Sequence, residues 1–155
     1  MATADDVAAA VIEQTGPIDT FKLQKLVYYS QAWHLAWDGE QLFEEDIEAW
    51  AGGPVVRSLY SRHRGQYAVT RWPWGSSDNL TASERETVRI VVDAYGRLTG
   101  RQLSALTHRE RPWRDARGDL APGERGDRVI TPGDIADYYA GLDQDETATP
   151  VEDLA

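Results

Sequence analysis

The residues that could do chemistry in this chain are few, and its three histidines come first. His34, His63 and His108 are the candidate bases or metal ligands, because the chain contains no cysteine. They do not stand at a ligand spacing such as HExxH, so a zinc site would need carboxylates from distant parts of the sequence. His34 and His108 lie among apolar residues, where an imidazole is usually a core residue with hydrogen-bonded nitrogens. We therefore expect both to be structural, and we expect no metal and no other cofactor.

Motifs for nucleophilic catalysis and phosphate binding are missing as well. The sequence has no G-x-S-x-G and no S-x-x-K. Gly52-Gly53-Pro54 lacks the Lys-Ser/Thr pair that completes a phosphate loop. We interpret it as a sharp corner between a strand and a short helix, with Pro54 in the first helical position. Alternatively, the backbone N–H groups of this corner could bind a carboxylate or phosphate of a partner. We predict no catalytic residue and expect that the protein is not an enzyme. The alternative is an enzyme of unknown chemistry that pairs His34 or His108 with a carboxylate.

Charge and composition limit the possible partners. The formal net charge is −10, and residues 143–155 carry several acids and no Lys or Arg. A negative chain disfavours general nucleic-acid binding, which depends on neutralising phosphates, and suits a basic protein partner. The absence of cysteine, of a signal peptide and of any run of roughly 18 apolar residues fits a cytoplasmic protein that does not enter membranes.

The elements that must position any site are mostly helices. Apolar residues recur with helical spacing from Leu23 to Trp37, and the opposite side of this segment is also largely apolar. Such a helix is buried and central. Further helices are predicted over residues 4–15, after the capping box Thr81–Glu84, around residues 103–106, at Pro112 and after Thr131. The predicted core contains Leu26, Trp33, His34, Trp37, Trp50, His108 and Trp113.

Two short segments, Ile47–Trp50 and Arg128–Ile130, are the candidate strands. The predicted fold is therefore mostly α, a single compact helical domain over residues 1–142 with a possible minimal two-stranded antiparallel β pairing. Residues 143–155 have no pattern that could pack, so we expect an acidic, disordered tail that is dispensable for folding.

The chain contains an ordered set of short motifs: Leu23–Leu26, Tyr28–Leu35, Ile47–Trp50, Gly53–Val56, Leu59-Tyr60, Leu103–His108 and Pro112-Trp113. In this order they resemble the Panacea-domain family. The resemblance covers most of residues 5–142. It implies a small prokaryotic or prophage-borne protein, often the antitoxin of a two-gene toxin–antitoxin pair. Some relatives resemble adaptors that deliver a toxin to a protease.

The resemblance leads to two functional hypotheses. In the first, the protein is an antitoxin that neutralises a cognate protein toxin by direct binding, and the toxin is encoded by an adjacent gene. In the second, it is a proteolytic adaptor that delivers the toxin to a AAA+ protease, which would engage the acidic tail. Nucleic acid is not an expected partner in either case, except for the protein's own operator.

A toxin-binding surface can be predicted from charge and aromatic content. Toxins that act on RNA or nucleotides tend to be basic, so the acidic run from Glu40 to Glu48 is one candidate. Trp72-Pro73-Trp74 is another, because exposed Trp is favoured at interfaces; alternatively this loop folds back as a lid over the core, and the acidic run is only a solvated loop. The arginine-bearing face around Trp113 is the next candidate. The predicted toxin-binding residues are Glu44, Glu45, Glu48, Gly53, Pro54, Trp72 and Trp74.

Overall fold

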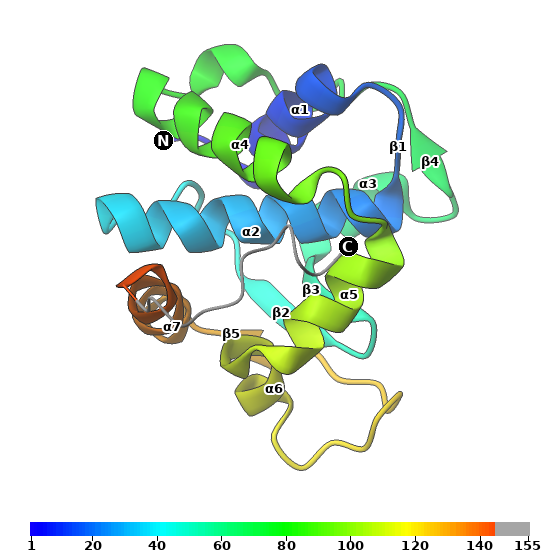
Figure 1. Cartoon of the computed structure of the whole chain (residues 1–155). Coiled ribbons are helices and arrows are strands. Elements are labelled where there is room, and N and C mark those ends of the chain that lie inside the picture. The colour runs from blue at the N-terminus through cyan, green and yellow to red at the C-terminus, as the bar shows by residue number, and fades with distance from the viewer. Residues whose placement is uncertain (145–155) are drawn as a thin grey trace.

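A single long helix runs through the middle of the molecule. The structure, a computed structural model, describes residues 1–144. Helix α2 (Thr20–Asp38) lies between the other elements (Figure 1). Its first turn is capped by Asp19, whose side chain accepts from the Lys22 backbone N–H at 2.7 Å. It ends at Gly39, which adopts the left-handed conformation that glycine tolerates best. The prediction of a central helix in this segment is confirmed.

The remaining helices cover α2 on two sides. Helices α1 (Ala4–Thr15) and α4 (Ala82–Tyr95) lie on one side, and α5 (Gly100–Arg109), α6 (Arg111–Arg117) and α7 (Pro132–Gln144) lie on the other (Figure 1). Helix α3 (Arg57–His63) and the 3-10 turn η1 (Ser77–Asn79) complete the helical elements of residues 1–144. Capping boxes at Thr3, Thr81 and Thr99 start α1, α4 and α5. In this part of the chain no helix is both long and apolar enough to cross a membrane.

Two small antiparallel sheets join the helices. Strand β2 (Ile47–Trp50) is the middle strand of the larger sheet, between β3 (Gly53–Val56) and β5 (Val129–Ile130). Ile47 lies opposite Ile130, so the predicted pairing of these two segments is confirmed. Strands β1 (Ile18–Asp19) and β4 (Ala68–Val69) form the second sheet. The fold is a single, mostly helical domain, as predicted.

One prediction about the corner after β2 was wrong. Pro54 does not start a helix; it lies in β3 opposite Ala49, and α3 begins only at Arg57. The chain turns at Ala51-Gly52 and enters β3 at Gly53, which forms a hairpin instead; we call this corner the Gly52-Gly53 turn. Strand β3 is an edge strand, where a proline without an N–H can be accommodated.

The end of the chain also differs from the prediction. Helix α7 continues two residues past the predicted boundary at 142, to Gln144. The rest of the predicted acidic tail, residues 145–155, lies outside the described residues.

The core follows the predicted stripe of α2 except at its two tryptophans. Leu26 is fully buried, and Trp33 is half-buried with its indole N–H donating to the Tyr95 hydroxyl at 2.8 Å. Trp37, predicted to be largely buried, is 39% exposed. It lies in the last turn of α2, and its ring stacks on Trp33 at a centroid distance of 5.3 Å. Because the helix ends here, the core does not extend far enough to cover it.

A buried carboxyl group attaches α7 to the rest of the domain. Glu110, at the junction of α5 and α6, accepts hydrogen bonds from the hydroxyl groups of Tyr29 at 2.6 Å and Tyr139 at 2.8 Å. Tyr139 also bonds the hydroxyl of Tyr28 at 3.0 Å. Burial raises the pKa of Glu110 to about 7, and the two tyrosine hydrogen bonds oppose this rise. In the sequence Glu110 was indistinguishable from a surface charge.

Glu110→Gln should change how stability depends on pH. Below pH 4.5, the ordinary pKa of a glutamate, Glu110 is protonated in both the folded and the unfolded chain. Between pH 4.5 and about 7 the folded chain holds the proton more tightly, so the free energy of unfolding falls as pH rises. The loss approaches roughly 3 kcal/mol, since a pKa difference converts at about 1.4 kcal/mol per unit. Urea titrations from pH 4.5 to 7.5 should show this slope in the wild type and a flatter curve in the variant; equal slopes would contradict the assignment.

The two tryptophans of α2 should differ in their importance for stability. Trp33→Ala removes a packed ring and its hydrogen bond to Tyr95, and should lower the free energy of unfolding by about 3 kcal/mol. Trp37→Ala removes a ring that is partly in solvent already, and should cost about 1 kcal/mol. Thermal unfolding of both variants checks this order, and equal losses would show that Trp37 is packed more completely than the structure indicates.

Candidate protein-binding surface

The acidic run contributes fewer free carboxylates than the sequence suggests. Glu44 is exposed. Glu45 accepts from the Ala4 backbone N–H at 2.9 Å, at the start of α1. Glu48 accepts from the Arg57 guanidinium at 2.8 and 3.0 Å and from the Trp50 indole N–H at 2.8 Å. Two of the three predicted acids therefore serve contacts within the domain.

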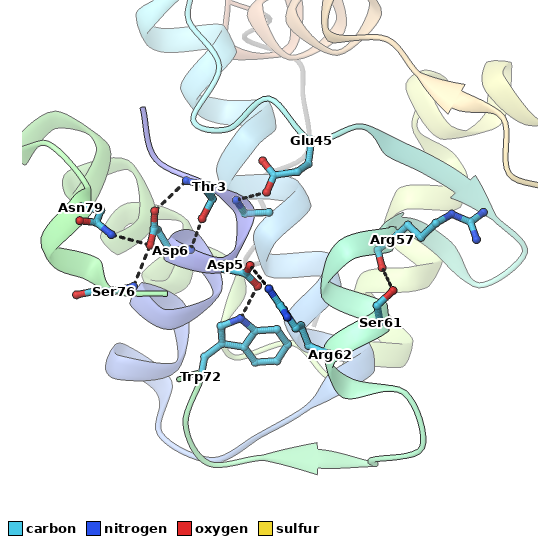
Figure 2. A network of polar contacts seen from close by, with 11 residues as sticks. Thr3, Asp5, Asp6, Glu45, Arg57, Ser61, Arg62, Trp72, Ser76 and Asn79 are labelled. Atoms are coloured by element: carbon cyan, nitrogen blue, oxygen red, sulfur yellow. Dashed lines mark hydrogen bonds and ion pairs between the residues drawn. The ribbon is translucent and has the colours of Figure 1, made fainter. Parts of the chain in front are cut away.

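The Trp72–Trp74 loop packs against the start of α1, as Figure 2 shows for Trp72. Trp72 is buried, and its indole N–H donates to Asp5 at 2.9 Å. Asp5 also pairs with Arg62 at 3.3 Å. The sequence left open whether this loop is exposed to a partner or folds back over the core. Trp72 folds back over the core. Trp74 remains 44% exposed, and the Arg62 guanidinium lies 5.3 Å from its ring.

A second carboxylate at the start of α1 holds the segment that follows this loop. Asp6 accepts from the Thr3 backbone N–H, the Ser76 backbone N–H and the Asn79 side-chain amide, all within 3.0 Å (Figure 2). Burial acts to raise the pKa of Asp6, but these hydrogen bonds outweigh it and lower the pKa. The network thus fixes the path of the chain around Trp72, and it explains why this tryptophan is not available to a partner.

The Gly52-Gly53 turn lies above a buried lysine. Gly53 has φ +132°, and a Cβ at this position would come within 2.4 Å of the Lys25 Cε. Gly53 and Pro54, both predicted to bind the toxin, are buried and offer little surface to a partner. Lys25 is fully buried, with its Nζ 3.5 Å from the centroid of the Phe21 ring and 3.4 Å from the Phe21 carbonyl oxygen. None of the ion pairs within residues 1–144 involves Lys25. Burial lowers its pKa to about 7, with Asp19 acting in the opposite direction.

Side chains from α5 and α6 support the turn from below. Ser104 donates to the Gly52 carbonyl at 2.6 Å, and the indole N–H of Trp113 donates to the Trp50 carbonyl at 2.8 Å. The ring of His108 stacks on Trp113 at 3.8 Å. Trp50, His108 and Trp113, predicted as core residues, are each only partly buried. His108 and Trp113 lie beneath the turn, whereas the Trp50 ring packs beside it against Tyr60.

The histidines lie in separate environments. His34 is buried in α2 and bonds the Thr87 hydroxyl at 2.8 Å. His63 is buried in α3 and bonds the Gln24 amide at 3.0 Å. Burial lowers the pKa of both His63 and His108, with Lys25 adding to the effect. Among residues 1–144, no three histidine or acidic side chains lie together in a way that could hold a metal ion.

An open groove lies on one side of the turn. We call it the arginine groove; it has a volume of about 670 Å³ and is lined by Trp50, Ala51, Gly52, Arg57, Tyr60, Arg64, Arg125, Gly126 and Asp127. The rings of Trp50 and Tyr60 meet edge to face at 4.9 Å. Arg57 is paired with Glu48, whereas the guanidinium groups of Arg64 and Arg125 have no hydrogen bond or ion pair within the described part of the chain.

A second pocket lies on the other side of the turn. Phe21, 42% exposed, and Tyr67, 85% exposed, line it together with Asp19, Lys22, Thr99, Gly100, Arg101 and Ser104. Ideal Cβ atoms at Gly52 and Gly100 would lie 3.0 and 2.9 Å from the Phe21 ring, so the absence of side chains at these two glycines leaves room for the ring. The two pockets and the turn between them form one surface that is rich in aromatic and cationic side chains. We call it the turn surface.

The Gly53-Pro54 corner was among the predicted toxin-binding residues, but the arginines around it could not be assigned to this surface from the sequence, for a physical reason. The arginines all lie between Arg57 and Arg128, but acids interleave with them along the chain. Arg64 follows α3 and Arg125 precedes β5, so only folding brings them to one groove. The one available signal was the Gly-Gly turn itself.

Lys25→Met should stabilise the protein. Methionine has a similar length and can fill the space beside Phe21 without a charge. Lys25 is charged in both states below pH 7, so its burial lowers stability there, and the cost fades as pH rises from about 7 toward 10.5. The variant should gain about 1–4 kcal/mol at pH 7, by analogy with the range seen when buried ion pairs are replaced by apolar groups. Its advantage over the wild type should shrink between pH 7 and 9 in chemical denaturation. A loss of stability at pH 7 would mean that the ammonium group is held by stronger contacts than those seen.

Comparison with known proteins places the central part of the chain in a family. The family model described as "Antitoxin SocA-like, Panacea domain" matches residues 23–114, which include most of α2, the Gly52-Gly53 turn, and the supporting Ser104, His108 and Trp113. No curated protein and no solved structure matches the chain. The match spans more than half of the sequence and agrees with the resemblance of its motifs. The chain therefore belongs to the antitoxin SocA-like, Panacea domain family.

Proposed function

We propose that this protein is a non-enzymatic antitoxin that acts in the cytoplasm and neutralises a cognate protein toxin by direct binding. The observation that carries the proposal is the family match over residues 23–114, because that family is described as antitoxin-like. The partner would be a toxin encoded by a neighbouring gene.

The turn surface is the part of the structure best suited to bind such a partner. It exposes Phe21 and Tyr67 on one side and the half-buried rings of Trp50 and Tyr60 on the other. Tyr, Trp and Arg are the residue types most often found at energetic centres of interfaces. By contrast, of the residues predicted in the acidic run and the Trp72–Trp74 loop, Glu44 is exposed and Trp74 is partly exposed. These two residues remain a second candidate for contact with the toxin.

The decisive experiment is a titration of purified toxin with purified antitoxin in the absence of any protease. Direct binding predicts that toxin activity falls linearly and reaches zero at a fixed, small molar ratio. An enzyme that modifies the toxin would inactivate many equivalents, with an extent that grows with time. Inhibition that appears only after a AAA+ protease and ATP are added would instead support the adaptor hypothesis.

Two variants connect the titration to the structure. Phe21→Ala together with Tyr67→Ala should weaken toxin binding at least tenfold, because both rings are substantially exposed. The Phe21 ring also covers the buried Lys25, so thermal unfolding of the double variant is measured first to show that it is folded. The matched control is Ile90→Ala, an exposed apolar residue of α4 that lies outside the turn surface. Equal toxin affinity for the double variant and the control would place the interface elsewhere.

A further inference from the structure

The arginine groove is a cationic site on a chain of net charge −10. The groove contains three arginines and one acid, Asp127. Arg57 already binds a carboxylate, Glu48, through two nitrogens of its guanidinium. Arg64 and Arg125 present the same planar donors to the groove, without a partner among residues 1–144. Such a fork matches the geometry of a carboxylate.

Both walls of the groove are held in place before any partner binds. Arg64 is the residue at which α3 ends, and its backbone N–H donates to the Tyr60 carbonyl at 2.8 Å. On the other wall, buried Arg117 donates to the carbonyl oxygens of Ala121 and Glu124 at 3.0 and 2.7 Å, next to Arg125 in the chain. A pre-organised site loses less entropy on binding than a mobile one.

The floor of the groove suits an extended peptide. Ala51, Gly52 and Gly126 have small or no side chains, so a backbone can approach closely. Trp50 and Tyr60 provide an apolar surface beside them.

We propose that the arginine groove binds an extended, carboxylate-rich segment of the protein partner, with Arg64 and Arg125 pairing with its acids and Trp50 and Tyr60 packing against an apolar side chain. This inference rests on the proposed function and names the chemistry of the toxin segment that the antitoxin recognises. It reverses the expectation from net charge, which pointed to a basic partner surface. Net charge governs long-range attraction, whereas the groove selects by local charge and shape.

The first test measures toxin binding by the full chain with Arg64→Glu and Arg125→Glu combined. The control, Arg71→Glu with Arg85→Glu, makes the same charge change at exposed arginines outside the groove. The groove variant should bind the toxin at least tenfold more weakly than the control. Wild-type binding should weaken as salt is raised, and the groove variant should lose most of this salt dependence. If wild-type chain fails to bind the toxin, the proposed function fails; if the wild type, the groove variant and the control all bind equally well, the proposed function stands and this inference is overturned.

The second test needs no toxin. A fluorescein-labelled ten-residue peptide of alternating glutamate and leucine is compared with a peptide in which serine replaces glutamate. The wild type and the control should bind the acidic peptide at least tenfold more tightly than the serine peptide, and the groove variant should not discriminate. Equal binding of both peptides by the wild type would overturn the inference.

Two competing occupants are tested with the same assay. A single-stranded ten-nucleotide DNA that displaces the acidic peptide at a lower concentration than unlabelled peptide would reassign the groove to nucleic acid. The acidic end of the chain itself is the other competitor. A full-length variant with Asp145, Glu146, Glu152 and Asp153 changed to amides would then bind the acidic peptide more than tenfold better than wild type, whereas equal affinity supports the proposal.

Discussion

The structure depends on hydrogen bonds made by the polar side chains of α2 that are buried in the core. Gln24 accepts from the Val56 backbone N–H at 2.9 Å and donates to its carbonyl at 3.2 Å, so a side-chain amide continues the hydrogen bonding of edge strand β3. Gln31 does the same for the loop after α2, through the Leu42 N–H at 2.6 Å and the Phe43 carbonyl at 2.9 Å. Thr20 donates to the Gln66 carbonyl at 3.0 Å, next to strand β4. A buried amide without partners would be strongly destabilising. Each of these residues therefore fixes one segment against the helix, and α2 serves as the scaffold for the non-helical parts of the fold.

Two ionisable groups depart from this pattern of neutral polar contacts. Glu110 and Lys25 are both buried without an opposite charge in ion-pair contact among residues 1–144, and burial moves both pKa values to about 7 from opposite directions. The loss of stability caused by burying Glu110 reaches its full size above the folded pKa of Glu110. The loss caused by burying Lys25 has its full size below the folded pKa of Lys25. Because both pKa values are about 7, the two losses coincide near neutral pH. Glu110 offsets part of its cost by joining α7 to α2 through Tyr139 and Tyr29. Lys25 lies under the turn surface, where a loss of stability is consistent with a functional role.

The arrangement separates two kinds of surface. Around the start of α1, Asp5 bonds the Trp72 indole and Glu45 bonds the Ala4 backbone N–H, and these contacts close that side of the domain (Figure 2). Around the Gly52-Gly53 turn, aromatic rings and guanidinium groups lie on a supported but open face. Residues that bond within the domain are poor candidates for binding a partner, because a partner must first replace those bonds. This difference, more than charge or aromatic content alone, is why the turn surface is the stronger candidate interface.

The sequence by itself determined most of the helices, their caps and the central position of α2, because these features arise from local periodicity and from residue preferences at helix ends. It also identified Ile47–Trp50 and Arg128–Ile130 as candidate strands, which the fold then pairs. It also carried the motifs by which the family could be identified. The tertiary structure alone decided that Trp72 is buried while Trp37 is not, that Pro54 extends an edge strand, and that Glu45, Glu48 and Glu110 bond internally. It also decided that Arg64 and Arg125 share one groove. Each of these outcomes depends on which distant segment lies opposite a residue. One side chain has the same local pattern whether it meets a hydrogen-bond partner or solvent, so only the assembled fold distinguishes a structural contact from a free binding group.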